Sequence, residues 1–458
     1  MTLPIMVDSI GAGVRFTLVQ NSTAFIAPTV TVLSFDDHAI HIAGSSVLLN
    51  VQGTVFGQNG IGTRSQTPLH TLFIDVGAQG RVIGEVAGIT GQGDEVIVRN
   101  HGMISGRSIG VSLYGDHNRV INDGVIEGAL CAIQCSTVSG TYDAAATVEN
   151  HGTIRSVRGA YSGDNTANDE LSNYGSISGE ISLYGGNDHL FNRGTIVGSV
   201  SAGAGNDDVR NVTGGVIDGK VDLGSGNDTY DGRGGEAWGV VSGGLGDDYF
   251  LGNAAHGEAF DGGVGSDLLD FSGGAAVTVA LDHSFANMGA ARGDTYSNFE
   301  RVIGSESGDV IRGSAAANVL AGRGGADRVD GATGDDTITG GAGHDTLTGG
   351  LGNDVFRFTA LSDFGDVITD FGNVSGNNDV FQLTAAALGG GLGAGALAPD
   401  RFLSRTDNHA HDANDRFIFR TTDTTLWFDA DGTGAGAAVL VADLQARVVL
   451  SVADIALI

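Results

Sequence analysis

The sequence predicts an all-β protein in which a parallel β-solenoid (a β-helix) runs into a tighter parallel β-roll, followed by a small non-repetitive β-rich C-terminal domain. Composition is the first reason. Glycine fills 77 of 458 positions, proline only 4, and 41% of the residues are hydrophobic. Such a chain is too apolar to stay disordered, and glycine interleaved with Val, Ile and Leu is typical of short strands joined by tight turns. Two internal repeats are the other reasons.

The shorter repeat begins at residue 304 and runs through six consecutive units of nine: GSESGDVIR, GSAAANVLA, GRGGADRVD, GATGDDTIT, GGAGHDTLT and GGLGNDVFR. The eighth position of every unit is apolar, and the sixth is acidic or an amide. The sixth-position residues are Asp309, Asn318, Asp327, Asp336, Asp345 and Asp354. In such a nonapeptide six residues turn and three form a strand, so two units make one coil. We therefore assign 304–357 to the β-roll.

The longer repeat has a period of about twenty residues. Five strings such as GAGND and GSGND end at aspartates spaced by 19, 21, 20 and 19 residues, namely Asp188, Asp207, Asp228, Asp248 and Asp267. A second element, N-x-G-x-I, falls between them, and further copies precede them. Its first residues include Asn100, Asn122, Asn150, Asn173 and Asn192. Two short β-runs and two turns per period predict one solenoid coil, with the asparagines stacked as a structural ladder.

The rest of the chain is assigned around these repeats. We expect irregular β N-terminal coils or a cap over 1–90 and the solenoid with its longer coils over 91–270. A strand-rich insertion is expected over 271–303, and the C-terminal domain over 358–458, where the repeats stop and aromatic residues return.

The net charge of −31, from 54 acidic and 23 basic residues, excludes some partners. No basic stripe is present for nucleic acid or an anionic membrane, and no apolar run is long enough for a membrane span. Cys131 and Cys135 are too few for a disulfide framework. The N-terminal MTLPIMVDSIGAG lacks the pattern of a cleaved signal peptide, so the chain is either cytosolic or exported by another route.

Coil geometry sorts the sixth-position residues onto two edges of the roll. Residues 18 apart share an edge, so Asp309, Asp327 and Asp345 form the first edge. Asn318, Asp336 and Asp354 form the second edge. Two carboxylates about 5 Å apart repel by roughly 3 kcal/mol at an effective dielectric of 20. A hard divalent cation between successive turns removes this repulsion, and an all-oxygen shell of carboxylates and turn carbonyls suits calcium.

The predicted calcium ligands are the sixth-position carboxylates and the carbonyl groups of the turn glycines. They are Asp309, Asp327, Asp336, Asp345 and Asp354, with Gly322, Gly324, Gly331, Gly340 and Gly349. Asp267 is an outlying candidate because its unit, GGVGSDLLD, matches the nonapeptide fully. Asn318 offers only a neutral oxygen, so a weak or missing site is expected there. Calcium binding and a hydrogen-bonded turn both remain open for Asp188, Asp207, Asp228 and Asp248.

These repeats resemble the repeats-in-toxin (RTX, hemolysin-type) calcium-binding family. The resemblance covers 240–458, including the lead-in NFERVIGSESGDVIRG and the C-terminal run DRFIFRTTDTTLWFDADGTG. It implies a β-roll that is disordered at low calcium and folds outside the cell. It also implies an uncleaved secretion signal near the terminal LSVADIALI, read by type I secretion machinery, and therefore a secreted protein.

Three classes of function remain open. The favoured one is a secreted calcium-binding protein with a structural, adhesive or matrix role, in contact with extracellular polysaccharide or a cell surface. A polysaccharide lyase or epimerase on the solenoid, and a surface-layer protein, are the alternatives. The sequence contains no HExxH and no P-loop, so the enzyme class is uncertain and disfavoured.

Overall fold

The computed structural model describes residues 2–5, 8–11, 13–63, 69–136, 145–252, 257–374 and 376–458. It confirms the predicted all-β parallel solenoid, and within these ranges α-helix is confined to α1 (Ala385–Leu388). Contacts divide the chain into two compact units. Unit 1 comprises Met1–Asp248 with Gly263–Gly265, and unit 2 comprises Tyr249–Gly262 with Ser266–Ile458. No helix among the described residues has the length and apolar character needed to cross a membrane.

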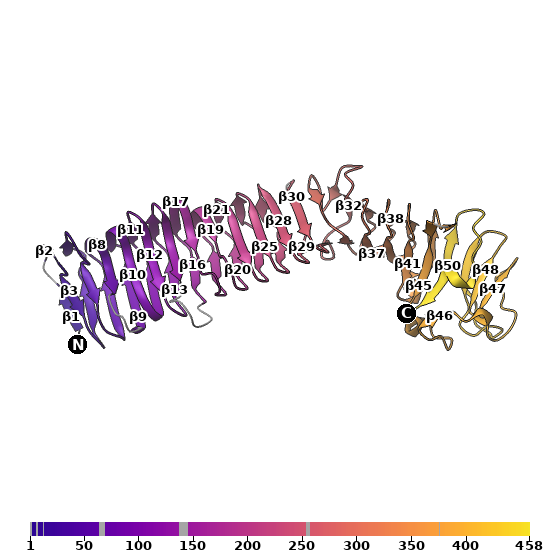
Figure 1. Ribbon diagram of the computed structural model, residues 1–458, viewed down its shortest axis with the longest axis horizontal. Coiled ribbons are helices and arrows are strands. Elements are labelled where there is room, and N and C mark those ends of the chain that lie inside the picture. The colour runs from indigo at the N-terminus through magenta and orange to yellow at the C-terminus, as the bar shows by residue number, and fades with distance from the viewer. Residues whose placement is uncertain are drawn as a thin grey trace. The chain divides into compact units, whose positions relative to one another are not determined.

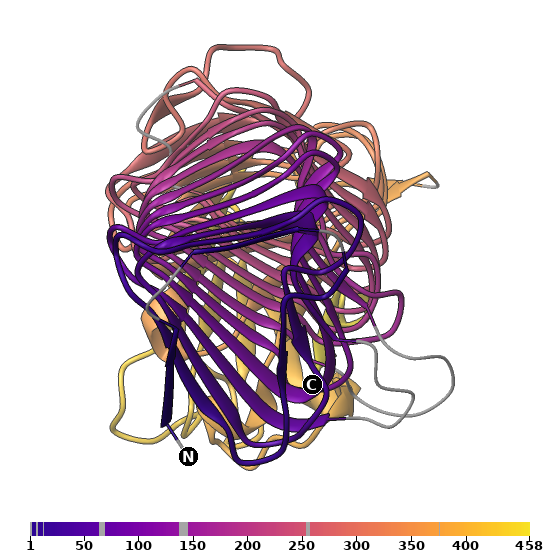
Figure 2. The ribbon, with the colours of Figure 1, turned by 90° about the vertical axis from the view of Figure 1, so that its left-hand side faces the viewer.

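Unit 1 stacks parallel strands in three ladders, one on each side of the coil (Figures 1 and 2). Ladder 1 consists of β1 (Thr2–Ile5), β4 (Thr23–Ile26), β7 (Val47–Val51), β9 (Leu69–Val76), the C-terminal part of β10 (Arg81–Asn100), β13 (Arg119–Asn122), β16 (Thr147–Asn150), β18 (Glu170–Asn173), β20 (His189–Asn192), β23 (Asp208–Asn211) and β26 (Thr229–Asp231).

The long strands β8, β10, β17 and β19 of unit 1 bend and contribute to both of the other ladders. Ladder 2 consists of β2 (Ser9–Gly11), β5 (Thr31–Ser34), β8 (Thr54–Thr63), β10, β11 (Met103–Gly106), β14 (Val125–Gly128), β17 (Thr153–Ser162), β19 (Ser176–Ser182), β21 (Thr195–Val197), β24 (Val216–Asp218) and β27 (Glu236–Ala237). Ladder 3 consists of β3 (Phe16–Leu18), β6 (Ile40–Ile42), β8, β10, β12 (Ile109–Tyr114), β15 (Cys131–Ser136), β17, β19, β22 (Val200–Ala204), β25 (Val221–Ser225) and β28 (Val240–Leu245).

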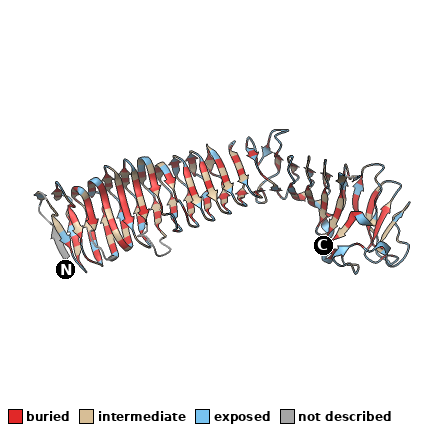
Figure 3. Ribbon diagram, viewed as in Figure 1, coloured by how far each residue is buried: buried red, intermediate tan, exposed pale blue. Residues whose placement is uncertain are grey.

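Strand alternation explains where the core of unit 1 lies. Strand residues are alternately buried and open to solvent, as in β16, because successive side chains point to opposite faces (Figure 3). The inward column of ladder 1 includes Val148, Leu171, Leu190 and Val209, each at most 1% exposed. Stacking identical positions of successive coils therefore fills the interior with Val, Ile and Leu.

Unit 2 contains two main parallel ladders, and the strands of the roll belong to them. One consists of β29 (Tyr249–Leu251), β31 (Leu268–Asp270), β35 (Arg301–Ile303), β37 (Val319–Gly325), β39 (Thr337–Gly343), β41 (Val355–Phe358), β45 (Val380–Leu383) and β51 (Ile455–Leu457). The other consists of β32 (Val277–Ala280), β36 (Val310–Arg312), β38 (Arg328–Asp330), β40 (Thr346–Thr348), β42 (Asp366–Ile368) and β50 (Val439–Leu444).

The eighth-position side chains of the nonapeptides form the core of the roll, as predicted. All are 0% exposed: Ile311, Leu320, Val329, Ile338, Leu347 and Phe356. The ladders continue beyond the last nonapeptide through β42 and β45. Antiparallel pairing then begins, because β50 is followed in its sheet by β49 (Thr425–Phe428) and β48 (Phe417–Arg420).

Candidate metal centre

The sixth-position residues of the roll form two hydrogen-bonded columns. On the first edge, the backbone N–H of Asp309 donates to Oδ1 of Asp327 (2.7 Å), and that of Asp327 donates to Oδ1 of Asp345 (2.8 Å). On the second edge, the N–H of Asn318 donates to Asp336 (2.7 Å), and that of Asp336 donates to Asp354 (2.9 Å). The structure thus places these residues in two columns with the 18-residue spacing inferred from the sequence.

Four of these carboxylates keep one oxygen without a hydrogen-bond partner. The Oδ2 atoms of Asp327, Asp336, Asp345 and Asp354 are buried and accept no hydrogen bond, in residues that are at most 2% exposed. A buried carboxylate oxygen without a partner is costly, so these atoms are suited to bind a positively charged ligand. Their column arrangement, with oxygen as the donor atom, fits a hard cation such as calcium.

The first glycine of each turn makes room for the carboxylate five residues later. A Cβ atom at Gly322, Gly331, Gly340 or Gly349 would lie 2.2, 2.3, 2.3 or 2.4 Å from Oδ2 of that aspartate. Any side chain at this position would therefore displace the carboxylate. Gly324 has a different neighbour, because its Cβ would lie 2.8 Å from Oε2 of Glu306.

The pKa values of these carboxylates show the electrostatic cost of the bare edges. Burial raises the pKa of Asp327 and of Asp336 to about 7, and the next carboxylate of each edge adds to the shift. Burial also raises the pKa of Asp345 and of Asp354. The N–H bond from the neighbouring coil lowers each pKa but does not offset burial. A bound cation would reverse this preference for the neutral form.

The first coil of the roll differs from this pattern on both edges. Oδ2 of Asp309 accepts the N–H of Ser305 (2.6 Å), and the Ser305 hydroxyl contacts both carboxylate oxygens. The expected full first edge therefore has a carboxylate that is already satisfied at Asp309. On the second edge, Oδ1 of Asn318 accepts the N–H of Ser314 (2.7 Å), and the weak site expected there stays a prediction.

Two carboxylates missed by the sequence reasoning extend the columns. The N–H of Asp345 donates to Oδ1 of Asp366 (2.9 Å), and that of Asp354 donates to Oδ1 of Asp379 (2.9 Å). Oδ2 of Asp366 is buried without a partner, and burial raises its pKa to about 8. The sequence pattern that could have identified them is Asp, then any residue, then an apolar residue, as in Asp366–Ile368. The glycine turn that normally precedes it is absent, which hid it.

Asp267 also belongs to a column of unit 2. It is fully buried, and its N–H donates to Oε2 of Glu300 (3.0 Å). Glu300 is followed by β35, as each sixth-position residue is followed by a strand, and its carbonyl accepts the N–H of Val319 (2.8 Å). A longer side chain thus stands where the nonapeptides have aspartate.

The upstream aspartates lie in one column of unit 1. The N–H of Asp188 donates to Asp207 (2.8 Å), that of Asp207 to Asp228 (2.7 Å), and that of Asp228 to Asp248 (2.8 Å). A second column of the same coils holds the asparagines, whose side-chain amides bond to one another. Its successive amide distances are 2.7 Å for Asn100–Asn122 and 2.8 Å for Asn122–Asn150, Asn150–Asn173, Asn173–Asn192 and Asn192–Asn211.

One other group of side chains could hold a metal ion among the described residues. His411, Asp412 and Asp415 offer ligand atoms within 4.8 Å of one another. Oδ2 of Asp415 accepts the N–H groups of His411 (2.6 Å) and Asp412 (2.9 Å), so this carboxylate shapes its loop.

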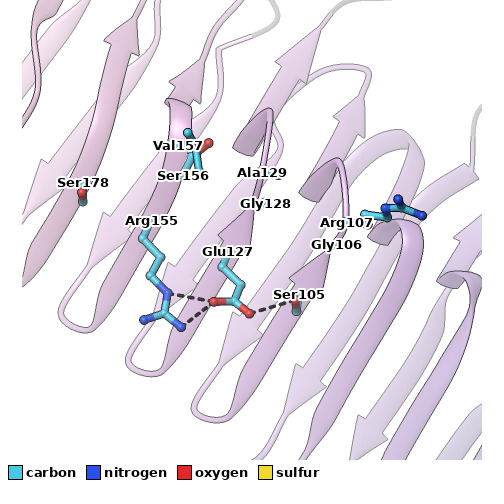
Figure 4. A pocket seen from close by; sticks show the side chains of 10 residues that line it. All are labelled: Ser105, Gly106, Arg107, Glu127, Gly128, Ala129, Arg155, Ser156, Val157 and Ser178. Atoms are coloured by element: carbon cyan, nitrogen blue, oxygen red, sulfur yellow. Dashed lines mark hydrogen bonds and ion pairs between the residues drawn. The ribbon is translucent and has the colours of Figure 1, made fainter.

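A groove on ladder 2 of unit 1 could accommodate a ligand (Figure 4). Its volume is about 510 Å³, and β11, β14, β17 and β19 contribute the lining. Glu127 crosses its floor, accepting from Nε of Arg155 (2.7 Å) and from the hydroxyl of Ser105 (2.9 Å). Val157 at its rim is 87% exposed. The groove is open to solvent, and most of the surface that lines it is apolar despite the ion pair of Glu127 and Arg155.

Comparison with known families settles the nature of the roll. Residues 303–338 and 322–356 match the family model of the RTX calcium-binding nonapeptide repeat. The chain carries RTX calcium-binding repeats. This confirms the resemblance inferred from the nonapeptides, and RTX repeats bind calcium, so calcium is the cofactor of this protein. A search of the curated proteins finds no match to the chain.

Proposed function

We propose that this protein is exported and folds its RTX roll on meeting calcium outside the cell, where it has a structural or adhesive role. The observation that carries the proposal is the set of buried carboxylate oxygens without a hydrogen-bond partner on the two edges of the roll. At low cytoplasmic calcium, the carboxylates of neighbouring coils would repel one another. Millimolar extracellular calcium would bind between them and allow the coils to stack.

The residues that would hold calcium are the open sixth-position aspartates together with carbonyl groups of the turns. On the first edge these are Asp327, Asp345 and Asp366, and on the second edge Asp336 and Asp354. Calcium supplies positive charge between successive turns. The chain itself supplies the rest, because the N–H ladder holds one oxygen of each carboxylate and leaves the other free to bind.

Folding and calcium binding are coupled in this proposal. The bare site exists only when the coils are stacked, so the free energy of binding adds directly to the free energy of folding. At a calcium concentration one hundred times the dissociation constant, each site would add about 2.7 kcal/mol. Several sites in two columns would make the transition steep.

Export through type I secretion machinery is the route that we propose, with the signal in the C-terminal segment. The structural or adhesive role is proposed for unit 1, whose stacked coils repeat their outward-facing strand positions along three ladders. The groove of Figure 4 provides a contact surface for extracellular polysaccharide, since Glu127, Arg155 and Ser105 present both hydrogen-bond donors and acceptors.

The test is calcium titration of the full chain, followed by far-UV circular dichroism and size-exclusion chromatography. We expect β-signal to rise and the hydrodynamic radius to fall as calcium is added, with no such change on adding magnesium. Secretion is tested in a host with and without a type I transporter. An unchanged spectrum between chelator and millimolar calcium would contradict calcium-driven folding, and equal export without the transporter would contradict the route.

Three further measurements distinguish the possible roles. Retention of the calcium-loaded protein on immobilised acidic or neutral polysaccharide would support adhesion. Growth of very large particles with calcium, measured by light scattering, would favour a surface layer instead. New double bonds in a uronate polymer incubated with the protein would indicate a lyase.

A further inference from the structure

One corner of unit 1 repeats the turn of the nonapeptides although its coils are longer. We call this the acidic corner and define it by the turns at 183–188, 202–207, 223–228 and 243–248. Each turn ends in an aspartate at its sixth position: Asp188, Asp207, Asp228 and Asp248. The RTX family model matches none of these residues, since its match begins at residue 303.

The backbone of these turns has the conformation of the calcium-binding turns. In the last four nonapeptides of the roll, positions two and four are left-handed, as at Gly341 (φ +104°) and Gly334 (φ +121°). In the acidic corner, position two is left-handed from Tyr184 (φ +76°) to Gly244 (φ +105°), and so is position four, as at Gly205 (φ +126°). Tyrosine at positive φ is uncommon, so the turn is imposed by the coil stack rather than chosen by that residue.

The turn carbonyls also line up in the same way from coil to coil. A Cβ on Gly226 would lie 1.8 Å from the carbonyl oxygen of Gly205, one coil earlier, and a Cβ on Gly205 would lie 1.8 Å from that of Gly186. In the roll, a Cβ on Gly352 would lie 1.9 Å from the carbonyl oxygen of Gly334. Successive turns of both regions therefore bring backbone oxygens to equivalent places.

The aspartates of the acidic corner also have the same hydrogen-bonding pattern as those of the roll. One oxygen of each accepts the N–H of the preceding coil's sixth position, as in the roll. The other oxygen, Oδ2 of Asp188, Asp207 and Asp228, is buried and accepts no hydrogen bond, in residues that are only 2, 2 and 1% exposed. Such atoms need a partner, and the neighbouring turn oxygens are themselves acceptors. A cation satisfies both kinds of oxygen at once.

We propose that the acidic corner of unit 1 is a second calcium-binding column, in which a hard divalent cation binds between successive turns from Asp188 to Asp248. Its ligands are the free aspartate oxygens and turn carbonyls, an all-oxygen set suited to calcium. The proposal goes beyond the nonapeptide roll, because it extends the cation sites into a region without RTX repeats.

The column should bind calcium more weakly than the roll. In its first three turns, position one holds Leu183, Ala202 and Leu223, all 0% exposed, where the roll has the glycine that leaves room for a carboxylate. The coils that carry the acidic corner also have one acidic edge each, whereas the roll has two acidic edges per coil. We therefore expect the solenoid sites to fill at higher calcium than the roll sites.

The test uses the full chain with the triple variant Asp188→Asn/Asp207→Asn/Asp228→Asn. Asparagine keeps Oδ1 as acceptor for the N–H ladder but removes the negative charge, so the hydrogen bonds of the coil are retained. The matched control is Asp123→Asn/Glu180→Gln/Asp218→Asn, which makes the same change of net charge at exposed positions of unit 1. Bound calcium is counted by native mass spectrometry.

The triple variant should bind fewer calcium ions than the wild type, and the control should bind the wild-type number. Calcium-induced protection of 304–357 in hydrogen exchange should be the same in all three proteins, which separates this proposal from the function proposed for the roll. An unchanged ion count in a folded triple variant would overturn the proposal.

A second measurement keeps the proposal testable if the triple variant fails to fold. Terbium replaces calcium in oxygen sites, and its emission is sensitised by a nearby tyrosine. Tyr184 belongs to the first turn of the acidic corner and is 48% exposed. Emission on tyrosine excitation should fall in Tyr184→Phe and be unaffected by Tyr114→Phe, a half-exposed tyrosine of β12. Equal emission from both variants and the wild type would contradict the proposed column.

Discussion

The solenoid of unit 1 and the roll of unit 2 both stack parallel coils, but the side chains at their corners differ. In unit 1, one corner holds an uninterrupted ladder of neutral amides, from Asn100 to Asn211, in which each side chain donates to the next. In the roll, both corners carry carboxylates, and four of them, Asp327, Asp336, Asp345 and Asp354, keep an oxygen without a partner. A neutral ladder satisfies itself, whereas a charged one needs a cation.

Core size reinforces this difference. Unit 1 encloses its apolar side chains between three ladders, whereas the roll has inward columns one residue wide, from Ile311 and Leu320 onward. A thin core offsets little of the conformational entropy of its glycine turns. We therefore expect calcium dependence to follow from a narrow core combined with charged corners, and not from the solenoid fold itself.

Removal of calcium should give the largest difference between the two regions. With a chelator in excess, we expect the amides of 304–357 to lose hydrogen-exchange protection, while those of ladder 1 between Thr147 and Asp231 stay protected. The reason is that the amide ladder and three-sided core of unit 1 persist without a cation. Loss of protection in both regions at the same chelator concentration would show that unit 1 depends equally on calcium.

The response to pH should have opposite signs with and without calcium. Burial raises the pKa of Asp327 and Asp336 to about 7 and that of Asp366 to about 8 in the calcium-free fold, above their values in an unfolded chain. Each unit of pKa corresponds to about 1.4 kcal/mol. The bare roll is therefore most stable below about pH 4, and it loses that stability as the pH rises through 7 to 8.

Calcium binds the deprotonated carboxylates, so the calcium-loaded roll should gain stability over the same pH range. Urea unfolding at pH 5 and pH 8, each with chelator and with millimolar calcium, gives the four free energies needed. A calcium-free roll that is more stable at pH 8 than at pH 5 would contradict the assignment of buried, unpaired carboxylates.

Interrupting the amide ladder should affect unit 1 alone. In Asn173→Ala the amide bonds to Asn150 and Asn192, both 2.8 Å, are lost and buried groups are left without partners. We expect the free energy of unfolding of unit 1 to fall by roughly 3 kcal/mol. The exposed Asn165→Ala is the matched control. The calcium midpoint of the roll should stay at its wild-type value, and a shift of that midpoint would link the two regions.

Neutralising a single roll carboxylate should have the smallest effect. Asp345→Asn keeps the N–H bond from Asp327 but removes one negative ligand, so we expect the calcium midpoint to rise about tenfold, or about 1.4 kcal/mol. The exposed Asp335→Asn is the control. Asp309→Asn should have less effect than Asp345→Asn, because Ser305 already hydrogen-bonds both oxygens of Asp309. Equal shifts at Asp309 and Asp345 would contradict that difference.

Much of this architecture was predictable because the period of a repeat gives the length of a coil and the residues that stack from coil to coil. The inward positions and the 18-residue spacing follow from the nonapeptide alone, and the structure places Asp327 and Asp345 in one column accordingly. Asp366 and Asp379 were missed because they lie beyond the last glycine turn and join the columns through strand pairing of β42 and β45. Their nearest partners are 21 and 25 residues away, outside the regular period.

The sequence by itself determined that the chain is a solenoid, that its last coils carry two acidic edges, and that calcium is the cation suited to them. Only the tertiary structure decided which carboxylates are open to a cation. Ser305 satisfies Asp309, no described residue donates to Oδ2 of Asp345, and the acidic corner of unit 1 repeats the turn of the roll. The physical reason is that a carboxylate's partners come from neighbouring coils, and spacing along the chain specifies the column but not those contacts.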